Sequence, residues 1–268
     1  MPFQTIYTSG TGMLGMEKKL NVISNNLANI ETTAFKKQRA NFEDLFYDNL
    51  RYPGSQDVNG EFAATGIAIG VGTRVTSIQS DFSMGSITQT GRDLDVAIAG
   101  EGFFQCTDPF TGEIFYSRAG NFSINSNGML TLGSSHNGRL VEPAISVPPN
   151  TEKIQIDDSG MVWVVQNGDV QQLQLIGQLE LATFINPEGL LRVGENLYRE
   201  TEASGGAVVN NPGMNGTGML RSQHLEMSNV APVIELIDMI TSQRAYELNS
   251  KSTQTGDQIL QAAISIKR

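Results

Sequence analysis

The sequence predicts an α+β fold with one long helix at each end of the chain and a β-rich middle. Three observations predict it. Apolar residues recur every three or four positions near the N-terminus, and the same spacing returns near the C-terminus, which is the period of an α-helix. Between the two ends, short runs of alternating apolar and polar residues are separated by turns that contain glycine, a pattern typical of antiparallel strands.

The N-terminal segment, from Thr5 to about Ile30, has the pattern of a helix with one narrow apolar stripe. The heptad positions of this stripe are Ile6, Met13, Met16, Leu20, Ile23, Leu27 and Ile30. Asparagines such as Asn26 and Asn29 then predict its end, because asparagine caps a helix well and extends it poorly. Three glycines interrupt the helix at a cost of about 1 kcal/mol each relative to alanine, so we expect a close packing surface at Gly10, Gly12 and Gly15.

A second helix is predicted from about residue 230 to Ile266. Ser228 and Asn229 suit its N-cap, and Pro232 is tolerated in a first turn. Its stripe comprises Ile237, Ala245, Leu248, Ser252, Thr255, Ile259, Ala262 and Ile266. Because each terminal helix buries only a stripe, each is the best partner of the other, and a coiled-coil-like pair is expected. The longer helix keeps further apolar side chains for contacts with other subunits: Val233, Leu236, Ile240, Leu260, Ala263 and Ile264.

The segment between the N-terminal helix and the β-rich middle is mixed. Residues 31–35 are expected to be extended, and residues 40–50 are predicted to form a short amphipathic helix. Residues 55–72 are rich in glycine and loop-like, with a strand at residues 66–72. A phosphate-binding loop is not expected there, because no helix and no Lys-Ser/Thr pair follows the glycines.

From Asp95 onward the pattern predicts strands. Residues 122–130 and 154–162 match apolar position for apolar position, and each contains two alternating runs joined by an Asn-Gly or Ser-Gly turn, as in a β-hairpin. A third turn is expected at residues 186–189, and Trp163 is interpreted as a core residue. These units predict a small antiparallel sheet or barrel-like domain.

The predicted domain boundaries follow these changes of pattern. Residues 1–35 and 226–268 form the terminal helical domain. Residues 36–94 and 192–225 form a discontinuous connecting domain with the long glycine-rich segment. Residues 95–191 form the inserted β domain.

Composition excludes several classes of protein. The 268 residues contain 18 basic and 28 acidic side chains, a formal net charge of −10 that repels nucleic acid. Cys106 is the only cysteine, so no disulfide can form within the chain. No apolar run approaches the ~18 residues of a membrane-spanning helix, and the N-terminus lacks the pattern of a cleaved signal peptide. Composition alone therefore indicates a cytoplasmic protein.

No catalytic, cofactor-binding or metal-binding constellation is predicted. His136 and His224 are far apart in the sequence and lack partners at ligand spacing. Residues 157–160 are interpreted as a turn and not as a calcium loop, which needs alternating carboxylates. Asp93 and Asp95 are interpreted as a solvated strand edge.

Two motifs resemble those of the bacterial flagellar basal-body rod and hook protein family. The N-terminal motif comprises Ser24, Asn25, Asn26, Leu27, Ala28 and Asn29, followed by Ala34, Phe35 and Lys36. The C-terminal motif comprises Ser242, Gln243, Arg244, Ala245, Tyr246, Glu247, Leu248, Asn249, Ser250 and Lys251. The resemblance covers essentially the whole chain. Residues 50–56 and 69–75 are most similar to the distal-rod members of the family.

The resemblance implies a structural subunit that polymerises into the rigid tubular distal rod of the flagellar basal body. This rod would transmit torque from the motor to the hook and form part of the export channel. The terminal helices would form its inner domain (D0), the β domain (D1) would lie outward, and residues 55–72 would stiffen the rod. The implied partners are copies of the chain itself, proximal rod proteins, the hook protein, the ring bushing in peptidoglycan and outer membrane, and the flagellar type III export apparatus.

The resemblance also corrects the expected location. Rod proteins are exported without a cleaved signal peptide, so the implied place is the rod that spans the periplasm. Phe42 and Phe46 match the family's export-gate pattern, although the buried face of a short helix would explain them as well.

Three alternatives stay open at this point. The chain could be a proximal rod or hook subunit of the same family. It could be a β-rich carbohydrate-binding or adhesive module, although its aromatic residues mostly occupy alternating apolar positions, which favours a core. The enzyme alternative is a hydrolase that uses Asp93 and Asp95.

Overall fold

The computed structural model describes residues 2–54, 56, 62, 64–133, 138–166 and 173–266. The chain forms two compact units. Unit 1 comprises Met1–Ala28, Gln38–Ser80 and Ala231–Arg268, and unit 2 comprises Asn29–Lys37 and Asp81–Val230. Two terminal helices and a β-rich middle confirm the predicted α+β class. The finer division into three domains stays a prediction.

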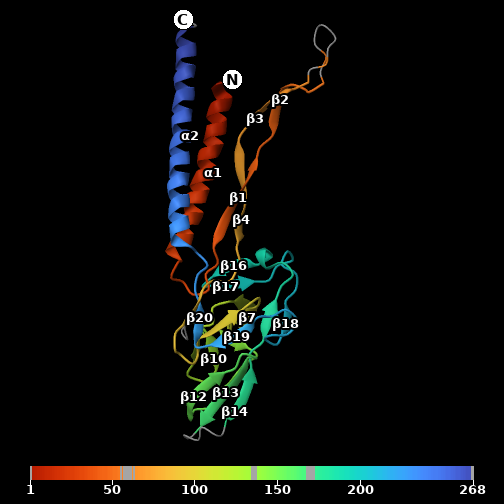
Figure 1. Cartoon of the computed structure of the whole chain (residues 1–268), viewed down its shortest axis with the longest axis vertical. Coiled ribbons are helices and arrows are strands. Elements are labelled where there is room, and N and C mark those ends of the chain that lie inside the picture. The colour runs from red at the N-terminus through yellow and green to blue at the C-terminus, as the bar shows by residue number, and fades with distance from the viewer. Residues whose placement is uncertain are drawn as a thin grey trace. The chain divides into compact units, whose positions relative to one another are not determined.

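Unit 1 is built on the two terminal helices. Helices α1 (Pro2–Ala28) and α2 (Pro232–Ile266) lie side by side and antiparallel, as Figure 1 shows in red and blue. Strands β1 (Gln38–Asp44) and β4 (Thr73–Ser80) form an antiparallel ribbon that packs on α1. This ribbon continues into a second pair, β2 (Tyr47–Arg51) and β3 (Ile67–Gly70).

The predicted helix at residues 40–50 is wrong, because these residues form β1 and β2. Pairing with β4 satisfies the backbone of β1, and the ring of Phe42 packs against α1 at Gly15, where an added Cβ would lie 2.9 Å from the ring. Such tertiary contacts routinely override weak helical patterns. The predicted strand within residues 66–72 is confirmed as β3. Of the predicted loop at 55–72, residues 55, 57–61 and 63 lie outside the described part of the chain.

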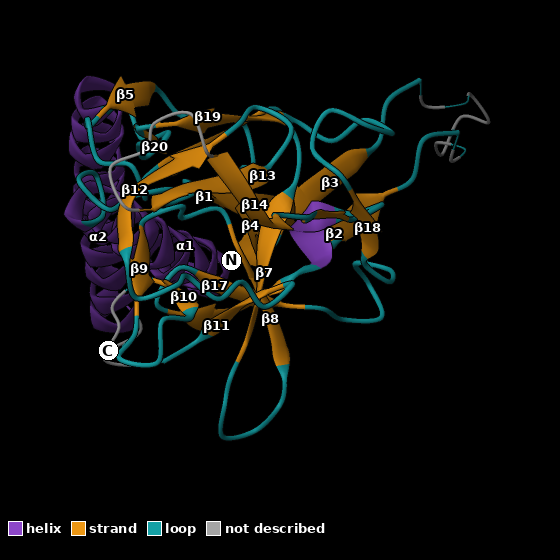
Figure 2. Cartoon of the chain, turned by 90° about the horizontal axis from the view of Figure 1, so that it is seen from below, coloured by secondary structure: helices purple, strands orange, loops and turns teal. Residues whose placement is uncertain are grey.

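Unit 2 consists almost entirely of strands and loops (Figure 2). Among the described residues, nine antiparallel strands form the main sheet: β7 (Phe103–Thr107), β8 (Ile114–Ser117), β9 (Phe122–Ile124), β10 (Leu130–Leu132), β11 (Leu140–Glu142), β15 (Leu181–Thr183), β16 (Leu191–Gly194), β17 (Leu197–Arg199) and β18 (Val208–Asn210). Strand β7 is central and pairs with β8, β11 and β15. A three-stranded sheet contains β12 (Thr151–Ile156), β13 (Met161–Gln166) and β14 (Leu173–Gln178). Two further pairs are β6 (Val96–Ala99) with β19 (Met219–Ser222) and β5 (Ile87–Gln89) with β20 (His224–Glu226).

Both predicted hairpins are confirmed. β9 pairs with β10 and β12 pairs with β13, each across a turn that ends in a glycine with positive φ, Gly128 at 78° and Gly160 at 82°. A side chain there would be strained, which is why glycine suits these positions. The third predicted turn contains a short 3-10 helix, η1 (Pro187–Gly189).

The core of unit 2 has two clusters. The larger one lies between the sheets and includes Ile98, Phe104, Phe122 and Leu181, all nearly inaccessible to solvent. The smaller one is aromatic, with ring contacts among Phe82, Phe103, Tyr116, Phe184 and Tyr198. Cys106 belongs to the larger cluster, where burial raises the pKa of its thiol to about 12. The interpretation of Trp163 as a core residue is wrong, since its neighbours Val162 and Val164 take the inward positions of β13.

Gly120→Ala tests how tightly this core is closed. A Cβ at position 120 would lie 1.7 Å from the main-chain oxygen of Val96. Because backbone must shift to admit the methyl group, we expect a loss of about 2–3 kcal/mol in the free energy of unfolding, measured by urea denaturation. Gly206→Ala in the same unit, where nothing lies within 4 Å of an added Cβ, is the matched control. Equal stability of the two variants would contradict the prediction.

Candidate assembly surface and buried polar junctions

The contact between α1 and α2 is made largely by small and polar residues. On α2, Glu235, Ser242, Asn249 and Gly256 recur every seven positions and are buried or half-buried. The hydroxyls of Ser9 and Ser252 lie 3.0 Å apart, and a Cβ added to Gly12 would lie 2.9 Å from the side-chain amide of Asn249. Small residues therefore let the two helices approach closely.

The three predicted packing glycines have different surroundings. Gly12 faces α2, and Gly15 packs against Phe42 of β1. Gly10 has nothing within 4 Å of the position a Cβ would take. The helix thus carries one glycine that no contact within the described residues of the chain requires.

Most of the predicted apolar stripe of α2 does not face α1, although Ser252 contacts Ser9 of α1 and Ala245 is half-buried. Ile237, Leu248 and Ile259 are 56%, 66% and 55% exposed, and Thr255 is also exposed. Ile266 is the last residue of α2. Heptad spacing identifies residues that share a helix face, but it does not say which face meets the partner. On α2 the polar face is inside.

On α1 the predicted apolar stripe is partly buried. Ile23 is 4% exposed, and five others are half-buried: Ile6, Met13, Met16, Leu20 and Leu27. Ile30 is half-buried beyond the end of the helix at Ala28.

Each helix presents an apolar surface to solvent. We define the α2 stripe as Val233, Ile237, Ile240, Leu248 and Ile259, which share one side of the helix by their spacing and are all more than half exposed. Of the other apolar residues predicted to stay uncovered, Leu236, Ala263 and Ile264 are exposed and Leu260 is half-buried. We define the α1 groove as the hollow lined by Ile6, Tyr7, Gly10, Thr11, Met13, Leu14, Glu17 and Tyr246. Exposed apolar surfaces of this kind mark interaction sites.

A polar junction closes unit 1 at the end of α1. Asn26 is 1% exposed, and its side-chain amide donates to the main-chain oxygen of Gln38 at 2.8 Å and to Oε2 of Glu235 at 3.1 Å. Its Oδ1 accepts from the main-chain N–H of Gln38 at 2.9 Å. One side chain thus joins α1, the start of β1 and the first turn of α2. A buried group whose hydrogen bonds are satisfied in this way specifies one arrangement.

A second polar junction closes unit 2 around Glu226. Its Oε1 accepts from Nζ of Lys36 at 2.7 Å and from the N–H of Gly85 at 2.9 Å, and its Oε2 accepts from Nε of Arg118 at 2.9 Å. The side chains of Glu226 and Lys36 have no exposed area, and that of Arg118 has 3%. Lys36 also donates to the main-chain oxygen of Ser83 at 2.7 Å. The carboxylate therefore connects three segments that are distant in sequence.

Lys36 and Arg118 share this one buried carboxylate, and the arrangement shifts the pKa values of Lys36 and Glu226. Burial and, second, the charge of Arg118 lower the pKa of Lys36, Glu226 offsets part of the effect, and the resulting pKa is about 8. Burial acts to raise the pKa of Glu226, but Arg118 and Lys36 outweigh it and hold that pKa below its usual value.

The N-terminal family motif continues into this junction. Ala34 is buried with φ at 55°, and its N–H donates to the main-chain oxygen of Glu226. The guanidinium of Arg192 lies 5.3 Å from the ring centroid of buried Phe35. Sequence reasoning found Phe35 and Lys36 through the motif. It missed Arg118 and Glu226, which stand in strand patterns with no local sign of burial.

The motif residues divide by exposure. The buried members are Asn26, Phe35 and Lys36, and Leu27, Asn29, Ala245 and Asn249 are half-buried. Asn25 is exposed and donates to Oε1 of Gln38 at 3.1 Å. Ala34 and Ser242 are also buried and Ser250 is half-buried. The remaining members are exposed on the helices: Ser24, Ala28, Gln243, Arg244, Tyr246, Glu247, Leu248 and Lys251. The N-terminal motif is thus explained by contacts within the chain, while much of the C-terminal motif points outward.

The candidate export pattern lies on the β ribbon and not on a helix. Phe42 is 36% exposed in β1, and Phe46 is 89% exposed in the connection between β1 and β2. The structure therefore supports neither residue as the buried face of a short helix.

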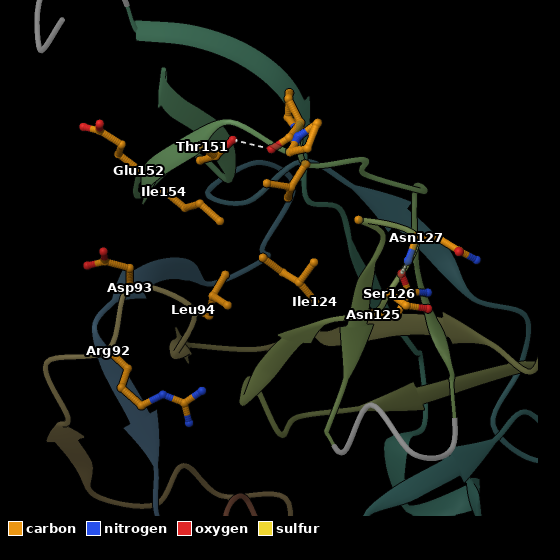
Figure 3. Close-up of a pocket in the computed structure, with 14 residues that line it drawn as sticks. Arg92, Asp93, Leu94, Ile124, Asn125, Ser126, Asn127, Thr151, Glu152 and Ile154 are labelled. Atoms are coloured by element: carbon orange, nitrogen blue, oxygen red, sulfur yellow. Dashed lines mark hydrogen bonds between the residues drawn. The ribbon is translucent and has the colours of Figure 1, made fainter. Parts of the chain in front are cut away.

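One hollow of unit 2 carries no catalytic arrangement. Leu94, Ile124 and Ile154 line it, with the charged side chains of Asp93 and Glu152 beside them (Figure 3). Asp95 is buried outside this lining, so the two aspartates considered for a hydrolase do not converge. Asp93 instead accepts a hydrogen bond of 2.8 Å from the amide of Gln223.

Other chemistry is equally unsupported. Within the described ranges no group of His, Cys, Asp and Glu could hold a metal ion. Nδ1 of His224 lies 2.7 Å from the main-chain oxygen of Ser222, and His136 lies outside the described residues. No helix in the part of the chain that the structure describes is long and apolar enough to cross a membrane.

Comparison with known proteins identifies relatives along the whole chain. Residues 6–36 match the family described as flagella basal body rod protein, residues 97–164 the flagellar hook protein FlgE/F/G D1 domain, and residues 221–266 the C-terminal region of flagellar basal body rod FlgEFG proteins. The flagellar basal-body rod protein FlgG of Buchnera aphidicola subsp. Schizaphis graminum is 44% identical over 96% of this chain and 97% of its own length. The protein of the same name from Caulobacter vibrioides is 42% identical over 98% and 99%. The flagellar hook protein FlgE of Escherichia coli is 24% identical over 96% and 98%.

Glu226→Gln tests the junction of unit 2. The change keeps the shape of the side chain and leaves two buried cations without a counter-charge, so we expect a loss of about 3–5 kcal/mol in the free energy of unfolding at pH 7. The difference from wild type should narrow as the pH falls below about 4.5, because the unfolded chain then binds a proton that folded Glu226, whose pKa is held lower, does not yet bind. Glu43→Gln, which breaks an exposed ion pair with Arg74, should cost at most about 1 kcal/mol. Similar losses in both variants would refute a special role for Glu226.

Lys36→Met tests the sharing of one carboxylate by two cations. Between pH 8 and 10.5 folded Lys36 has lost its proton while the unfolded chain retains it, so folding stability gains from a rise in pH. Wild type should therefore gain stability relative to Lys36→Met across this window, by up to about 1.4 kcal/mol per pH unit. The measurement is chemical denaturation of both proteins at several pH values. Parallel profiles would show that the pKa of Lys36 is not lowered.

Proposed function

Because this chain belongs to the flagellar basal-body rod protein family, we propose that it polymerises through its terminal helices into the rigid, tubular distal rod. It is a structural rod subunit of the flagellar basal body and not an enzyme. The observation that carries the polymerisation proposal is the α2 stripe. Five large aliphatic side chains on one side of α2 lie exposed while its polar side contacts α1.

The exposed α2 stripe makes assembly energetically favourable. A polar contact between α1 and α2 gives the pair little hydrophobic stabilisation, because polar groups exchange hydrogen bonds with water for hydrogen bonds with each other. Full burial of a Val, Leu or Ile side chain stabilises by about 1.5–3 kcal/mol. Covering the stripe with neighbouring subunits therefore contributes on the order of 10 kcal/mol before the entropic cost of association. Assembly would supply the burial that the single chain lacks.

The wider role is proposed from the family and from this surface together. In the rod the terminal helices form the inner domain and border the export channel, the β domain of residues 95–191 lies outward, and the connecting segments join them. The tube transmits torque to the hook, spans the periplasm and turns within the ring bushing in peptidoglycan and outer membrane. Its axial partners are proximal rod proteins and the hook protein, and the flagellar type III apparatus exports it without a cleaved signal peptide. The export-gate role of Phe42 and Phe46 and the stiffening role of residues 55–72 remain part of this proposal.

The test is polymerisation of the full chain with and without the stripe. Ile237→Ser/Ile240→Ser changes two exposed residues, so the fold of the monomer should persist by circular dichroism. We expect the protein concentration needed for tubes, measured by sedimentation and electron microscopy, to rise at least about tenfold, which corresponds to ~1.4 kcal/mol.

The matched control for this test is Phe110→Ser/Ile185→Ser, which removes two side chains that are each 89% exposed in unit 2. It should assemble nearly as wild type does. Polymerisation through the terminal helices would be refuted if wild type stays monomeric at every concentration. The same conclusion follows if the stripe variant assembles as readily as wild type.

A further inference from the structure

We infer that the α1 groove of one copy receives the α2 stripe of a second copy, with Glu17 of the groove paired with Arg244 of the stripe. The inference rests on the proposed polymerisation and names the two surfaces that meet. Both surfaces belong to unit 1; the groove is lined by α1 with Tyr246 of α2 at its edge, and the stripe lies on the side of α2 away from α1.

The α1 groove has the form of a hole on a helix surface. Gly10 is among its lining residues, and an added Cβ there would meet nothing within 4 Å. Tyr7 and Leu14, one turn before and one turn after Gly10, are 58% and 61% exposed, and Ile6 also lines the hollow. A glycine inside a helix costs about 1 kcal/mol relative to alanine. An incoming side chain from a second copy gives this glycine a packing role.

The α2 stripe has exposed aliphatic side chains and one exposed arginine that can pack into this groove. Ile240 and Leu248 are exposed, and Arg244 lies midway between them at four residues from each, on the same side of α2. Arg244 is exposed and forms no ion pair within the described part of the chain. It also belongs to the C-terminal motif, whose outward members have no explanation within the monomer.

Charge decides which surface meets which. Glu17 follows Leu14 by three residues in the groove, is exposed, and has no ion pair among the residues the structure describes. A groove facing a second groove would bring two copies of Glu17 together, and a stripe facing a stripe would do the same for Arg244. Like charges in such positions oppose association, whereas groove against stripe pairs opposite charges.

The pairing also fits an open polymer. Two different surfaces of one chain make a heterologous contact, which repeats without limit when the rotation between copies does not close a ring. A contact between identical surfaces would end at a dimer.

A charge exchange tests the pairing in full-length protein. Glu17→Lys alone places a cation in the groove against Arg244, and Arg244→Glu alone places two carboxylates together. Each variant should need at least about ten times more protein to polymerise than wild type. An equimolar mixture should polymerise near the wild-type concentration, because each groove then finds a stripe of opposite charge when the two variants alternate.

Controls and other outcomes separate this inference from the proposed function. Lys18→Glu, beside Glu17 but outside the groove, and Arg221→Glu, exposed in unit 2, should assemble as wild type does. If wild type polymerises and the two single variants polymerise equally well, the pairing is overturned while polymerisation stands. Failure of the mixture to recover overturns it as well. If wild type itself never polymerises, the proposed function is what fails, and the pairing fails with it.

Discussion

The fold of unit 2 depends on one buried carboxylate. Glu226 accepts hydrogen bonds from Lys36, Arg118 and Gly85, so the chain that leaves α1 and the chain that leads to α2 are held to the same β framework. Two cations around one anion would be unfavourable in an apolar interior without these hydrogen bonds. The arrangement therefore tolerates few substitutions. It explains why a Lys stands after an Ala-Phe pair in the N-terminal motif.

In unit 1 polar residues are buried between the helices and aliphatic residues are exposed, which is the reverse of the usual distribution. Asn26, Glu235 and the two serines Ser9 and Ser252 make the contacts between and around the helices, while long aliphatic side chains face solvent. Polar contacts of this kind define alignment more than they stabilise, as a single polar residue does in a coiled coil. Because the aliphatic side chains of α2 stay exposed, the single subunit gains little stability from its helix pair. The same side chains provide apolar area that a polymer can bury.

The sequence predicted the helices, the two hairpins and the α+β class, because 3.6- and 2-residue periods and Asx-Gly turns are local signals. It predicted a helix at residues 40–50 wrongly, because only the partner strand β4 and the contact of Phe42 with Gly15 decide that segment. The motif led to Asn26 and Lys36, but nothing local distinguishes Glu226 or Arg118 from surface charges. The side of α2 that meets α1 also depends on which partner approaches, which a heptad cannot specify.

The ion pair of Lys36 with Glu226 has a kinetic consequence. The two residues are 190 positions apart, and closing so long a loop must precede any gain from the contact. Contacts of such sequence separation slow folding. A polypeptide that emerges N-terminus first therefore carries residues 29–37 without their place in unit 2 until residue 226 has followed. Folding of unit 2 is therefore completed only when most of the chain is present, so the fold itself determines that the N-terminal segment of this unit is ordered late.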